Sequence, residues 1–165
     1  MPALEAGVKA PAVKLPLVAG GTFDLAEALK RGPVVVAFFK ISCPVCQFTF
    51  PYLERIYRSY PQGQYTLLGV SQDEENYTEE FAREYGISFP LALEDVDEYA
   101  VSNAYGLTNV PTIFMISPGG GVQLTIIGWD RREMEKLNRE VARVSGAAVN
   151  ILFQPGEDIP ESQPG

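Results

Sequence analysis

Apolar residues recur along the chain in two patterns, one typical of buried strands and one typical of amphipathic helices. Residues 34–39 are a continuous apolar run of β-branched and aromatic side chains, which predicts a buried central strand. Residues 75–85 and 131–144 have helical spacing, and Gly86 ends the first of these helices. Weaker patterns predict strands at 65–71, 112–117 and 122–127, helices at 25–30 and 97–105, a helix after Cys43, and a short connection at 90–93.

The order of these elements predicts the fold class. Strands alternate with helices, and the Gly-rich turn at 118–121 predicts that the last two strands form a hairpin. A short edge strand at 13–17 followed by Gly20-Gly21 predicts a second hairpin near the start of the chain. We therefore expect an α/β fold with a central mixed β-sheet flanked by helices and an N-terminal β-hairpin extension.

The composition changes near residue 146. The chain has 165 residues and is 46% hydrophobic, which is enough for one domain with a substantial core. Residues 146–165 are rich in Pro, Gly and Glu, and this composition is typical of a disordered or loosely attached segment. We expect a domain at 1–145 and a C-terminal tail at 146–165.

Charge narrows the range of partners. The formal net charge is −8 without a basic cluster, which argues against nucleic acid and anionic membrane surfaces as partners. No apolar run is long enough to predict a membrane span. The first residues lack the pattern of a secretory signal, so the sequence as it stands predicts a cytoplasmic protein, or a periplasmic or extracytoplasmic one if a leader preceded it.

The two cysteines of the chain lie between the predicted strand 34–39 and the helix that follows it, as Cys43-Pro44-Val45-Cys46. Unsatisfied N–H groups of a first helical turn favour a thiolate at the N-cap, which is the expected place of Cys43. Pro44 suits the first helical position because it has no N–H to satisfy. We expect Cys43 to attack a partner disulfide and the more buried Cys46 to resolve the mixed disulfide.

Two structural roles for the cysteine pair, a static disulfide and a zinc site, fit the sequence less well than the redox role. A static disulfide that closes so short a loop stabilises little, because the stabilisation grows with loop length. The chain has no histidine, so a zinc site lacks two of its four usual ligands, and we expect no metal. The redox reading predicts no cofactor other than a Cys43–Cys46 disulfide.

Motifs spread over the chain from about Thr22 to Val144 resemble those of a known family. The chain is similar to thioredoxin-fold proteins, and most closely to the TlpA/ResA-like thiol-disulfide oxidoreductases, which stand beside the alkyl hydroperoxide reductase/thiol-specific antioxidant group of the redoxin superfamily. The motifs that carry the resemblance are the run 34–39, Cys43-Pro44-Val45-Cys46, Phe50-Pro51-Tyr52, Tyr85-Gly86-Ile87, Val110-Pro111-Thr112 and Phe114-Met115-Ile116.

The resemblance implies a thioredoxin-like fold and thiol-disulfide exchange with a protein partner. It implies that the peptide bond before Pro111 is cis, that Pro111 faces the dithiol, and that the backbone of Val110 pairs with an extended partner chain. It implies antioxidant activity and a role in cell redox homeostasis. We expect a monomer.

The chain departs from the family pattern close to the cysteines. Ser42 stands where thioredoxins have tryptophan, Ala37 where they have a buried acid, and Thr49 where ResA-like proteins have glutamate. This leaves open which group accepts the proton of Cys46, and Lys40 is either a partial substitute or a solvated surface lysine. Residues expected around the dithiol are Lys40, Ser42, Pro44, Val45, Thr49, Thr112 and Trp129, although packing against the last helix is the more usual role for a buried tryptophan such as Trp129.

Three rival functions share the fold. A peroxiredoxin-like thiol peroxidase needs a Thr three residues before its reactive cysteine and a Pro further upstream, but Cys43 and Phe39 stand at these positions relative to Cys46. A copper carrier needs a histidine. A non-catalytic binding module does not require two intact cysteines. Peroxide reduction is the main alternative to disulfide exchange.

Overall fold

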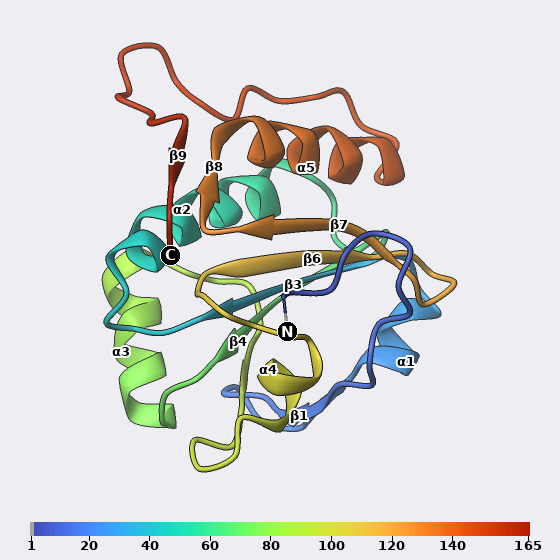
Figure 1. Ribbon diagram of the computed structural model, residues 1–165. Coiled ribbons are helices and arrows are strands. Elements are labelled where there is room, and N and C mark those ends of the chain that lie inside the picture. Colours follow the sequence, from blue (N-terminus) through green and yellow to red (C-terminus); the bar gives the residue numbers. More distant parts are fainter. Residues whose placement is uncertain (1) are drawn as a thin grey trace.

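The central sheet has five strands in the spatial order β5-β4-β3-β6-β7 (Figure 1). The computed structural model describes residues 2–165, and its strands β3 (Val34–Phe39), β4 (Thr66–Ser71) and β5 (Leu91–Leu93) run parallel to one another. Strand β6 (Thr112–Ile116) is antiparallel to β3, and β7 (Val122–Ile127) is antiparallel to β6. The prediction of a mixed sheet that ends in a hairpin is therefore confirmed.

Helices cover both faces of this sheet. The side chains of α2 (Pro44–Ser59), α3 (Glu75–Tyr85) and α5 (Arg131–Val144) join the core on one face, whereas α1 (Leu25–Leu29) and α4 (Ala100–Ala104) lie over the other face (Figure 1). Side-chain caps fix where two of them begin. Asp24 accepts from the Ala26 N–H at the start of α1, and Asp130 accepts from the Glu133 N–H at the start of α5.

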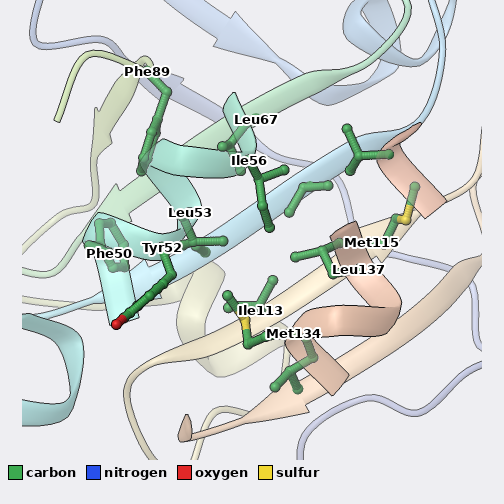
Figure 2. Close-up of a cluster of buried hydrophobic side chains, with 14 of the residues drawn as sticks. Phe50, Tyr52, Leu53, Ile56, Leu67, Phe89, Ile113, Met115, Met134 and Leu137 are labelled. Carbon is green, nitrogen blue, oxygen red and sulfur yellow. The ribbon is translucent and has the colours of Figure 1, made fainter. Parts of the chain in front are cut away.

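Strand β3 supplies both halves of the core because successive side chains of a strand point to opposite faces. Val35, Ala37 and Phe39 pack on the side of α2, in the same cluster as Leu53 and Ile113, which Figure 2 shows. The alternate residues of the strand pack on the side of α1. All six residues of β3 are buried, which explains why the sequence shows a continuous apolar run rather than alternation. The strand therefore holds α2, and with it the cysteines, on a rigid base.

The N-terminal extension is the predicted hairpin. Strands β1 (Lys14–Pro16) and β2 (Thr22–Asp24) pair in antiparallel register, and the Leu17 N–H donates to the carbonyl of Gly21 across the turn. Gly20 and Gly21 both have positive φ angles of 105° and 80°, which glycine adopts without steric cost.

Two predicted elements differ from the structure. The segment at 90–93, expected as a connection, contains strand β5, which pairs with β4 at the edge of the sheet. The helix expected at 97–105 forms only over Ala100–Ala104, because Tyr99 before it adopts a left-handed conformation with φ of 51°. Three residues are too few for a recognisable strand periodicity, so β5 could be assigned only from its pairing.

The C-terminal segment packs against the domain in this structure. Strand β9 (Ser162–Gln163) pairs antiparallel with β8 (Trp129–Asp130), and neither strand was predicted. The backbone of this segment comes to lie beside the first turns of α2 (Figure 1). The division into a domain at 1–145 and a tail at 146–165 stays a prediction. Within residues 2–165, no helix has the length and apolar character that crossing a membrane requires.

Candidate functional site

Cys43 lies at the N-cap of α2, directly after the loop that leaves β3. Its backbone is extended, with φ of −82° and ψ of 115°, and Pro44 is the first helical residue. The Cys46 N–H donates to Cys43 Sγ over 3.2 Å, and the Gln47 N–H donates to the Cys43 carbonyl over 3.0 Å. The Cys43 sulfur therefore accepts from an N–H of the first helical turn, at the positive end of the helix dipole.

Cys46 lies one turn further along the same helix and is fully buried, whereas Cys43 is partly exposed. Burial above all, and then the hydrogen bond with Cys43, raises the pKa of the Cys46 thiol far above its ordinary value of 9.0. Both cysteines are free thiols in this structure. The pair therefore combines one accessible sulfur with one that stays protonated until its surroundings change.

The loop that precedes β6 faces the first cysteine. The Val110–Pro111 peptide bond is cis, as the resemblance implied. The Cys43 thiol lies 3.4 Å from the carbonyl oxygen of Val110, to which it donates. The loop is held from both ends, because Thr112 Oγ1 donates to the Asn109 carbonyl over 2.8 Å and the Gly128 N–H donates to the Pro111 carbonyl over 2.8 Å. The structure thus brings together Cys43, Val110, Pro111 and Thr112.

The other residues expected around the dithiol are either exposed or buried in the core. Ser42, Pro44 and Lys40 are exposed, and Lys40 Nζ lies 5.9 Å from the centre of the Tyr99 ring, which favours the reading of Lys40 as a surface lysine. Thr49 is fully buried in α2, and its Oγ1 makes no hydrogen bond among the described residues. Ala37 lies in the same core cluster as Cys46. The positions that carry acids in the family pattern are thus apolar or neutral here.

Trp129 packs against α2 and against the C-terminal segment. Its ring centre lies 4.8 Å from that of Phe48 and 5.2 Å from that of Tyr52, and its Nε1–H donates to the Pro160 carbonyl over 2.8 Å. Its side chain is almost fully buried. Trp129 therefore joins α2 to the segment that contains Pro160.

Asp73 is the charged residue near the cysteines that the sequence analysis missed. Its Oδ2 accepts from the Ile41 N–H over 2.8 Å, and its negative charge adds a smaller contribution, after burial, to the raised pKa of Cys46. The strand pairing explains its position. Strands β3 and β4 are parallel and in register from Val34 to Phe39, so a residue two positions after β4 must lie near a residue two positions after β3.

A shallow, largely apolar groove lies beside the cysteines. Pro44, Val45 and Phe48 of α2 form one wall, and Pro160 and Gln163 of the C-terminal segment form the other. Val45, predicted as a neighbour of the dithiol, is partly buried there. In the described residues, no group of three or more His, Cys, Asp or Glu side chains is arranged to hold a metal ion.

Comparison with known proteins places this site in a family. A family model described as the AhpC/TSA family matches residues 6–125, which include both cysteines and the cis-proline loop. The chain belongs to the AhpC/TSA family. The chain is 30% identical over 139 residues to the thiol-disulfide oxidoreductase ResA of Geobacillus thermodenitrificans. The matched region covers 84% of this chain and 78% of that protein. It is 29% identical over 126 residues to ResA of Bacillus subtilis, covering 76% of this chain and 69% of that protein.

A solved structure supports the same fold. The crystal structure of a putative thiol:disulfide interchange protein DsbE from Chlorobium tepidum superimposes with a TM-score of 0.71 at 24% identity, and the match covers 87% of this chain and 99% of that one. This member of the AhpC/TSA family therefore has the thioredoxin-like fold that its motifs implied. It is an oxidoreductase of the thiol-disulfide class.

Proposed function

We propose that the chain exchanges disulfides with protein partners through the dithiol Cys43-Pro44-Val45-Cys46, with Cys43 as the attacking and Cys46 as the resolving residue. The observation that carries this proposal is the position of Cys43 Sγ, which accepts an N–H at the start of α2 and faces the Val110 carbonyl. The difference in exposure between the two sulfurs supports the assignment of their roles.

In the first step, the Cys43 thiolate attacks one sulfur of a partner disulfide. A bond forms between Cys43 and the partner, the partner's S–S bond breaks, and the second partner sulfur leaves as a thiolate that takes up a proton. The peptide that flanks the attacked cysteine extends along the Val110 backbone, as an added strand.

In the second step, Cys46 loses its proton and attacks Cys43 Sγ. The Cys43–Cys46 disulfide forms, the mixed disulfide breaks, and the partner leaves with both of its sulfurs reduced. Two electrons have then passed from the dithiol to the partner. The disulfide that results needs no other cofactor, and an external dithiol returns it to the reduced state.

Thiol peroxidase activity is the alternative, and one experiment separates the two functions. Dithiothreitol-driven reduction of insulin and consumption of hydrogen peroxide are measured on the same protein, on Cys43→Ser, and on Glu79→Gln as a control at an exposed position of α3. We expect insulin reduction by the unchanged protein and by Glu79→Gln, and background rates with Cys43→Ser. Fast peroxide turnover without insulin reduction would replace our proposal by the peroxidase function.

A further inference from the structure

The end of the C-terminal segment lies at the place where the proposed function requires a partner chain. The segment is anchored away from the dithiol, where both terminal nitrogens of Arg55 in α2 donate to the carboxylate of Glu157 over 2.7 and 2.6 Å. From there it passes Trp129, which donates to the Pro160 carbonyl, and pairs through β9 with β8. Residues 157–165 thus run from the middle of α2 toward the cysteines (Figure 1).

The last residues of the segment meet the cis-proline loop. Asn109 Nδ2 donates to the Gly165 carbonyl over 3.2 Å. Gly165 lies so close to the Val110 carbonyl that a side-chain carbon at position 165 would overlap it. The segment also crosses closely over Gly128, where an added side-chain carbon would lie 2.5 Å from the Gln163 carbonyl. The segment therefore occupies space next to the carbonyl that Cys43 faces.

The same segment forms one wall of the groove beside the cysteines. Pro160 and Gln163 stand opposite Pro44, Val45 and Phe48, so a polypeptide that approaches Cys43 from this side meets residues 160–165 first. One stretch of backbone cannot accept two added chains at the same time.

We propose that residues 161–165 occupy the partner-binding site beside Val110 and must be displaced before a protein disulfide can engage the dithiol. This inference rests on the proposed function. The occupant is a segment of this chain, and its competitor is an extended polypeptide that carries a disulfide.

The strength of the attachment suits a segment that leaves and returns. Residues 161–165 are exposed, and β9 has only two residues. By contrast, the anchor at Glu157 is a two-bond charge-assisted pair, and Leu152 before it is buried. Release can therefore be confined to the end of the segment, while the anchor and the bond from Trp129 to Pro160 remain.

A variant that lacks residues 161–165 tests the proposal and keeps both of these anchoring contacts. We expect its KM for insulin to fall by about threefold to tenfold, because the apparent affinity of a site rises when the fraction of molecules able to bind rises. The rate of Cys43 alkylation by iodoacetamide should change by less than about twofold, since a small reagent does not need the Val110 backbone. Circular dichroism and thermal unfolding check that the shortened protein is folded.

A full-length variant gives an independent measurement. Gly165→Val places a side chain against the Val110 carbonyl, so the end of the segment has to move away, and we expect the same fall in KM. Glu161→Gln is the matched control, because among residues 2–165 Glu161 bonds through its backbone carbonyl, which accepts from the Arg131 N–H, and not through its side chain. We expect an unchanged KM.

The outcomes distinguish this inference from the proposed function. An unchanged or higher KM in the shortened protein, with insulin reduction retained, would overturn the inference alone and leave the proposed function standing. A higher KM would show that residues 161–165 help to bind the partner. If neither the full-length nor the shortened protein reduces insulin while both are folded, the proposed function fails and the inference fails with it.

Discussion

Cys43 Sγ and the carbonyl oxygen of Val110 lie 3.4 Å apart, although 67 residues separate them in the chain. The strand pairing of β3 with β6 produces this contact, because Phe38, near the end of β3, is opposite Thr112, the first residue of β6. The loops that leave this edge of the sheet therefore place a reactive sulfur beside a backbone that can bind a peptide.

The two thiols should differ strongly in reactivity. In the reduced, folded protein we expect iodoacetamide to modify Cys43 on the order of 100-fold faster than Cys46, because the buried thiol reacts only when the structure opens. Mass spectrometry of peptides after timed labelling measures both rates in one sample. Labelling in denaturant is the control and should remove the difference. Equal rates in the native protein would show that Cys46 is accessible.

Burial of Cys46 should make the protein less stable at alkaline pH. Its pKa is higher in the folded than in the unfolded chain, so the folded state retains the proton and the stability gained is fully present below pH 9. This stability is lost as the pH rises above 9, where the unfolded thiol ionises. We expect urea unfolding of Cys46→Ala to depend less on pH above 9 than that of the unchanged protein. Tyr105, whose pKa burial also raises, is present in both proteins and does not contribute to the difference.

Charge near the buried thiol should affect the resolving step. Burial is the main cause of the raised pKa of Cys46, and the carboxylate of Asp73 adds to it. Asp73→Asn should therefore lower this pKa and move the pH dependence of mixed-disulfide resolution toward lower pH. Stopped-flow measurement of resolution between pH 6 and about 10 tests this, with the exposed Glu74→Gln as control. A shift toward higher pH would mean that Asp73 instead accepts the proton.

The anchor of the C-terminal segment should weaken in acid. The Arg55 guanidinium, helped by the Gln154 N–H, lowers the pKa of Glu157 from 4.5 to about 2. A lowered pKa contributes stability that is present above pH 4.5 and is lost as the pH falls toward 2. We expect Glu157→Gln to show a smaller loss of stability over this range than the unchanged protein, and hydrogen exchange at 154–157 to show faster exchange in the variant at neutral pH. Identical acid unfolding curves would contradict this role of the ion pair.

Close packing between β4 and its neighbours should make Gly69 intolerant of a side chain. An added carbon at Gly69 would lie 2.6 Å from Leu91 Cδ2 and 3.2 Å from Phe50 Cε2. We expect Gly69→Ala to lower the free energy of unfolding by about 1–3 kcal/mol. Gly119→Ala is the matched control, because its nearest neighbour is 4.0 Å away, and it should change stability by less than about 0.5 kcal/mol. A stability loss equal in both variants would argue against the packing at β4.

Periodicity predicted the parts of the fold that bury the most apolar surface. The apolar run at Val34–Phe39, the spacing at Glu75–Tyr85 and Arg131–Val144, and the turn before β7 each match the structure closely, because burial on one or both faces leaves a regular pattern. The cis peptide at Pro111 was implied by the family resemblance rather than by the residues themselves. Strand β5 is held by pairing with β4 and has no pattern of its own.

The rest of the site depends on contacts between distant segments. Asp73 reaches Ile41 through the alignment of two strands, and the sequence alone does not give that alignment. The C-terminal segment is polar and rich in Pro and Gly, so its composition predicts weak attachment. It is nevertheless held by the ion pair from Arg55 to Glu157 and by the bond from Trp129 to Pro160, which are specific contacts that composition does not reveal.

The roles of the two cysteines are tested most directly by trapping the mixed disulfide. Cys43→Ser and Cys46→Ser are each reduced, freed of reductant, mixed with insulin, and analysed by mass spectrometry without further reduction. We predict that Cys46→Ser accumulates a stable disulfide between Cys43 and insulin, because the resolving thiol is absent, and that Cys43→Ser accumulates none, because Cys46 is buried. Equal trapping by both variants, or trapping by Cys43→Ser alone, would contradict the account.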